Sequence, residues 1–150
     1  MINLQTMNSI RFLSSFLAFL AFGAAAVTAA PDSVKVIDHS VAGFKSVPSL
    51  RHPDTFLITL EVEYALTSKP KAVLKLALDH DKEMDFAIVD QKDVTADRKK
   101  RKIELKARLE KFTRDMLRGV VVLQDPDAAA GAPPLAMNGV SLKMKKFREF

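Results

Sequence analysis

Apolar and polar residues alternate most clearly between residues 56 and 66, where the sequence reads FLITLEVEYAL. Glu61 and Glu63 lie on the polar parity. Six apolar residues in strict alternation indicate a β-strand with one buried and one solvated face. The apolar residues are Phe56, Ile58, Leu60, Val62, Tyr64 and Leu66.

Shorter apolar or alternating segments follow, separated by turn residues. We expect turns at SKP (68–70) and HDKE (80–83), because such residues are typical of chain reversals. A first strand near residues 33–47 is expected to be broken or bulged around Gly43. The remaining strand candidates are 71–79, 84–90, 119–124 and 139–147.

The segment 98–118 admits two interpretations. Alternation of Ile103, Leu105, Ala107 and Leu109 favours a strand over 101–109, with a short helical turn near 111–117. Its richness in Lys, Arg, Glu, Leu and Ala is instead typical of a helix over about 98–118, which would make the fold α+β. We adopt the strand because the spacing of the neighbouring segments fits it better.

About seven strands with turn signals every 10 to 15 residues predict an all-β fold, an antiparallel two-sheet sandwich. With TFLITLEVEYAL, KAVLKLALD and GVVVLQ as its central strands, the chain resembles immunoglobulin-like and fibronectin type III-like sandwiches over about residues 34–147. The resemblance implies a single domain, over 30–150, whose end loops are available for recognition.

The first residues have a different character. Arg11 is the only charge before Asp32, and an apolar segment follows it and runs into small residues. This order is typical of a secretory signal peptide, and we place cleavage after Ala29. The chain is therefore expected to be secreted, into the extracellular space or a bacterial periplasm, with no transmembrane segment in its mature form.

Few residues suggest catalysis. The chain has no cysteine, which excludes thiol nucleophiles and thiolate metal sites, and no Gly-rich phosphate loop or nucleophile elbow. Its histidines, His39, His52 and His80, fall in separate segments without the spacing of metal ligands. We therefore expect no enzymatic activity, cofactor or metal.

The basic run Arg98, Lys99, Lys100, Arg101 and Lys102 is the main concentration of charge. Residues 97–118 contain ten Lys or Arg against four Asp or Glu. Such a patch could bind an acidic polysaccharide or an anionic lipid surface, whereas the lack of interleaved aromatic residues argues against nucleic acid. Alternatively, acidic residues of the same chain neutralise part of this positive charge.

In that alternative, Glu61 and Glu63 lie opposite Lys106 and Arg108 on neighbouring strands.

The leading functional hypothesis is a binding module for protein interaction or adhesion. The strands at 71–79, 118–124 and 139–147 would form one sheet, whose outer face has an apolar centre and a rim of lysines. The apolar run at 120–123 leaves two parities open: Val121 with Leu123, which we adopt, or Val120 with Val122. The predicted partner-binding residues, used together with the 125–138 loop, are Val73, Ala77, Val121, Leu123, Lys143 and Lys145.

Overall fold

The computed structural model describes residues 31–144, apart from the side chain of Arg98. These residues form five antiparallel strands and no helix. The predicted signal peptide (1–29) and Lys145 lie outside the described residues. The strands are β1 (Ser33–Phe44), β2 (Thr55–Lys82), β3 (Asp85–Leu109), β4 (Met116–Gln124) and β5 (Ala136–Lys143).

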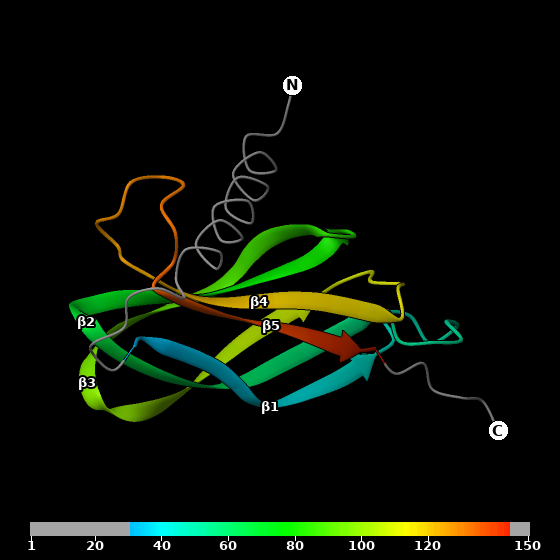
Figure 1. The fold of residues 1–150 in the computed structure, drawn as a ribbon. Coiled ribbons are helices and arrows are strands. Elements are labelled where there is room, and N and C mark those ends of the chain that lie inside the picture. Colours follow the sequence, from blue (N-terminus) through cyan, green and yellow to red (C-terminus); the bar gives the residue numbers. More distant parts are fainter. Residues whose placement is uncertain (1–30, 145–150) are drawn as a thin grey trace.

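The two long strands turn a corner together, so that the sheet folds over into two layers (Figure 1). In the first layer, residues 55–66 of β2 lie between β1 and residues 101–109 of β3. In the second layer, residues 71–78 of β2 lie between β4 and residues 85–95 of β3, and β5 pairs with the far side of β4. Five strands thus provide seven segments, which confirms the predicted all-β sandwich.

The corner is made by irregular pairing. Leu66 faces Asp97, and the next pair is Lys71 with Thr95, so residues 67–70 of β2 are extra. On β3 the extra residues are 98–100, which lie between the partners of Tyr64 and Leu66. Extra residues in one strand bend it and increase its twist. The basic run therefore begins in a bulge where β3 passes between layers.

Three local expectations were wrong. Residues 101–109 belong to β3, which confirms the adopted strand over the alternative helix at 98–118, but 110–115 is an irregular connection in place of the expected helical turn near 111–117. The register shift in β1 falls at Ile37, between Val36 and Asp38, and Gly43 pairs regularly with Phe56. The hairpin between β2 and β3 turns at residues 83–84, where Met84 has a positive φ of 63°.

The core lies between the layers and receives the apolar parity of every strand. No helix capable of crossing a membrane occurs among residues 31–144. Burial of these aliphatic side chains is the main source of stability in a chain without disulfides. The largest fully buried side chains are Ile58, Leu60, Val62, Leu66, Leu74, Leu76, Leu78, Leu105, Leu117, Val121, Leu123 and Leu142.

Candidate binding surfaces

The outer face of the second layer carries an apolar cluster separate from the core. Its buried members are Ala77 of β2, Phe86 of β3, and Val120 and Val122 of β4, with Met137 of β5 packed against them. All four strands of the layer thus contribute to it. We call these five residues the outer cluster.

The cluster extends into exposed apolar side chains toward the β2–β3 hairpin. Ile88 lies opposite Ala77, and Ala77 lies opposite Val120, so one apolar row crosses three strands. Ile88 is 56% exposed and Met84, in the hairpin turn, 54%. Met116, at the start of β4, is 38% exposed and shares the parity of Val120. The accessible part of this face is therefore near the hairpin.

The predicted outward orientation of Val121 and Leu123 is wrong. Both are fully buried between the layers, because Val121 pairs with the core residue Leu76 and Leu123 with Leu74. The parity that faces outward is the other one, with Val120 and Val122. The predicted residues Val73 and Ala77 do belong to the outer side of β2, and Lys143 is exposed on β5.

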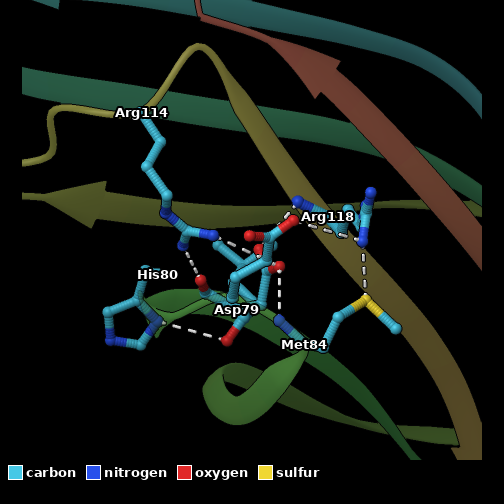
Figure 2. Close-up of polar contacts among 7 residues, drawn as sticks. Asp79, His80, Met84, Arg114 and Arg118 are labelled. Carbon is cyan, nitrogen blue, oxygen red and sulfur yellow. Dashed lines mark hydrogen bonds and ion pairs between the residues drawn. The ribbon is translucent and has the colours of Figure 1, made fainter.

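Asp79 is a buried carboxylate at the hairpin end of the same face (Figure 2). Its Oδ1 accepts a hydrogen bond from the backbone N–H of Arg118 at 2.8 Å, and its Oδ2 accepts one from that of Met84 at 3.0 Å. The guanidinium of Arg114 lies 3.5 Å from Oδ2 and also donates to the carbonyl oxygen of Asp79. That guanidinium stacks over the ring of Phe112, 5.1 Å from its centroid.

These contacts make Asp79 a structural group. Each carboxylate oxygen accepts a hydrogen bond from a backbone N–H of the protein, as is usual for a buried polar group. It ties the β2–β3 hairpin to the start of β4 and to the 110–115 connection. The contacts of Asp79 thereby fix the hairpin that carries Met84.

The basic run lies at the opposite end of the sandwich, along the corner of β3 (Figure 1). Residues 55–66 and 101–109 do pair as neighbouring antiparallel strands, as expected. The expected ion pairs of Glu61 and Glu63 with Lys106 and Arg108 do not form. Glu63 pairs with Lys100 at 3.4 Å and Glu61 with Lys102 at 3.5 Å. Lys106 and Arg108 pair instead with Glu104 and Glu110 on their own segment, at 3.3 and 3.2 Å.

The ion pairs at this corner present their cations to solvent. Lys100 is 68% exposed against 26% for Glu63, and Arg101 is 62% exposed against 25% for its partner Asp97. The pKa of Asp97 is lowered chiefly by the backbone N–H of Lys99, with Arg101 adding a hydrogen bond, against a smaller opposing effect of burial. The surface that a large ligand would meet is therefore more cationic than the composition suggests.

The connection between β4 and β5 is shorter than the predicted 125–138 loop. It spans residues 125–135, with turns closed by hydrogen bonds from Ala128 to Asp125 and from Ala132 to Ala129. Lys69, in the corner, lies 3.4 Å from the carboxylate of Asp125. The loop is thus held at the basic corner and away from the hairpin end.

The histidines are not brought together. His39 and His52 are exposed, and His80 lies 3.5 Å from the carboxylate of Asp81. Within residues 31–144 no group of three or more His, Asp or Glu residues is arranged to hold a metal ion.

Comparison of the sequence with family models and with curated proteins found no match. The fold is similar to parts of solved glycoside hydrolases. A family 2 member from Bacteroides cellulosilyticus matches with a TM-score of 0.53 and 14% identity, over 75% of this chain and 14% of that chain. A second, from B. cellulosilyticus DSM 14838, gives 0.53 and 13% over 75% and 15%.

A β-glucuronidase of glycoside hydrolase family 2 gives a TM-score of 0.50 and 11% identity, over 76% of this chain and 13% of that chain. The chain therefore spans about one seventh of the length of these enzymes. At such identities the likeness concerns the fold, which is that of a small β-sandwich part of a much longer glycoside hydrolase.

Proposed function

We propose that this chain is an exported, non-catalytic β-sandwich module that binds another protein through the outer face of its second layer. Support for a module comes from the small share of each glycoside hydrolase that the fold matches. The export rests on the predicted signal peptide.

The main support for this assignment is that the outer faces of the two layers differ. Charged residues dominate the outer face of the first layer, where Glu61, Lys102 and Lys106 point to solvent. The second layer instead has the outer cluster, extended by the exposed side chains of Met84 and Ile88. The cluster itself is largely buried, so only its edge near the hairpin is accessible, and we infer that the exposed apolar side chains that continue it there form the interface.

A pair of substitutions tests this assignment. Ile88→Glu places a charge on the exposed apolar row, and Leu57→Glu places the same charge on an exposed apolar position of the first layer. Each variant is used as bait in quantitative co-purification from the native source, and sedimentation velocity measures self-association. We expect Ile88→Glu to lose the bound protein and Leu57→Glu to retain it.

Loss of the bound protein in both variants, or in neither, would reject the outer face of the second layer as the binding site. Gly139→Arg provides an independent probe, since a side chain at Gly139 of β5 would enter open space beside Val120. This variant should fold normally and should also lose the partner.

A second candidate function is the binding of an acidic polysaccharide at the basic corner. The greater exposure of Lys100 and Arg101 over their acidic partners favours it. Retention on a heparin column should then fall steeply with salt. Replacement of Lys99, Lys100, Arg101 and Lys102 by Gln should abolish retention.

A matched control removes four exposed cations outside both the basic run and the loop between β1 and β2: Lys35, Lys82, Lys92 and Arg108. Equal elution of the two variants would mean that net charge alone sets retention and would reject the corner as a site.

A further inference from the structure

Three exposed apolar side chains gather at the β1–β2 end of the first layer, away from the outer cluster. Phe44, the last residue of β1, is 52% exposed, Val47 in the following loop 48%, and Leu57 of β2 41%. Phe44 pairs with Thr55, and Leu57 pairs with Ala42. Phe44 and Leu57 are therefore diagonal neighbours on the outer face of the first layer.

The loop that carries Val47 is fixed in place. Asp54 accepts hydrogen bonds from the backbone N–H and the hydroxyl of Ser46, at 2.7 and 2.6 Å. The N–H of Asp54 donates to the carbonyl of Phe44 at 3.0 Å, and a turn from Val47 to Leu50 closes at 3.2 Å. Phe44 and Val47 are thus exposed at a loop whose backbone is closed by hydrogen bonds.

Cations surround the apolar tip. Lys45 and Arg51 lie in the loop and are exposed, and within residues 31–144 neither forms an ion pair. Lys111 is exposed on the neighbouring connection, which is joined to the loop by a 2.9 Å hydrogen bond from the N–H of Phe112 to the carbonyl of Asp54. Asp54, the acidic group of this loop, is hydrogen-bonded to Ser46 and attracts Lys111. The three cations and this one carboxylate together leave a net charge of +2.

We propose that this end of the sandwich binds an anionic lipid bilayer, with Phe44 and Val47 entering the interface and Lys45, Arg51 and Lys111 contacting the headgroups. A loop tip that projects from the end of a sandwich suits a planar soft surface. Lysine is depleted in protein interfaces, whereas lysine and arginine beside apolar side chains are favoured at anionic membrane surfaces. The surface is distinct from the protein-binding face and does not depend on it.

The test uses tryptophan fluorescence, because the chain contains no tryptophan. Phe44→Trp in the full chain provides a single probe at the loop, and Ile88→Trp provides the matched probe on the second layer. Vesicles of phosphatidylcholine with and without phosphatidylglycerol are added, including lipids brominated on their acyl chains. Since each probe reports its own surroundings, membrane contact of the apolar residues 12–30 does not create the signal.

We expect Phe44→Trp to shift to the blue and to be quenched by brominated lipid with anionic vesicles only, while Ile88→Trp stays unchanged. Within the Phe44→Trp chain, Lys45→Gln and Arg51→Gln should each weaken partitioning about fivefold, and Lys71→Gln with Lys92→Gln, two exposed lysines of the second layer, should have no effect. No shift of Phe44→Trp, an equal shift of both probes, or equal binding to neutral vesicles would overturn the proposal.

Discussion

The carboxylate of Asp90 accepts a hydrogen bond from the backbone N–H of Lys106 at 2.8 Å. Asp90 lies in the second-layer part of β3 and Lys106 in the first-layer part, and each part is the edge of its layer. On the opposite side of the sandwich, the side chain of Asn138 in β5 accepts the N–H of Val36 in β1 at 2.9 Å. Side chains therefore bridge the layers at both open edges and occupy donors that could pair with another chain.

Asp90→Ala should free the Lys106 donor. We expect the free energy of unfolding to fall by about 1 kcal/mol, the net value of a hydrogen bond, and self-association to increase. Urea unfolding and sedimentation velocity measure the two effects. Asp93→Ala on the exposed side of the same strand serves as control; if it behaves like Asp90→Ala, the bridge has no protective role.

Removal of the buried Asp79 carboxylate should be more costly. Asp79→Ala leaves the N–H groups of Met84 and Arg118 without their acceptor, while the guanidinium of Arg114 loses the carboxylate but keeps the carbonyl oxygen of residue 79. A donor left without its acceptor costs about 1–3 kcal/mol, so the free energy of unfolding should fall by about 2 kcal/mol or more. Urea unfolding at neutral pH measures this loss, and Asp81→Ala, at an exposed neighbour, should cost less than about 0.5 kcal/mol. Similar losses in the two variants would contradict the structural role.

Two glycines in the second layer should respond oppositely to alanine. A Cβ at Gly119 would lie 2.8 Å from Leu78 Cδ2 and 3.0 Å from Val140 Cγ1, so Gly119→Ala should destabilise the fold by about 1–3 kcal/mol through overpacking. At Gly139 the nearest atom would be 3.9 Å away, so Gly139→Ala should be neutral or slightly stabilising. Thermal unfolding of both variants tests the packing, and equal midpoints would refute it.

Acid should weaken the loop at the β1–β2 end. Hydrogen bonds from the side chain and then the backbone of Ser46 lower the pKa of Asp54 below its ordinary value of 3.8. A pKa lowered by folding stabilises the folded chain above pH 3.8, and this stabilisation is lost as the pH falls through the folded pKa. The carboxyl resonance of Asp54 should titrate below pH 3.8 by NMR, and urea unfolding of Asp54→Asn should depend less on pH between 6 and 3. A titration midpoint at or above 3.8 would contradict the bonded geometry.

Alternation made most of the fold predictable. Where one face is buried, a period of two fixes both the strand and its orientation, as residues 56–66 and 101–109 illustrate. The run at 120–123 has no alternation, so its parity depends on the partner strand, and the pairing of Leu76 with Val121 decided it. The register between β2 and β3 was also beyond sequence reasoning, because the extra residues at 67–70 and 98–100 shift it.

The role of Asp79 was missed for a related reason. No role was assigned to Asp79 from the sequence, although it continues the outward parity of Val73, Lys75 and Ala77 along β2. An acidic residue within a strand, with Arg114 and Arg118 preceding an apolar strand, was the available signal. Only the tertiary pairing of β2 with β4 brings those groups together.

The most direct test of the protein-binding face is site-specific photo-crosslinking in the native cell. Benzoylphenylalanine is placed at Ile88 in one chain and at Leu57 in another, both exposed positions in the structure. Our account predicts a discrete crosslinked protein from position 88 that is lost when Gly139→Arg is added, and no such product from position 57. The same product from both positions, or none from position 88, would contradict it.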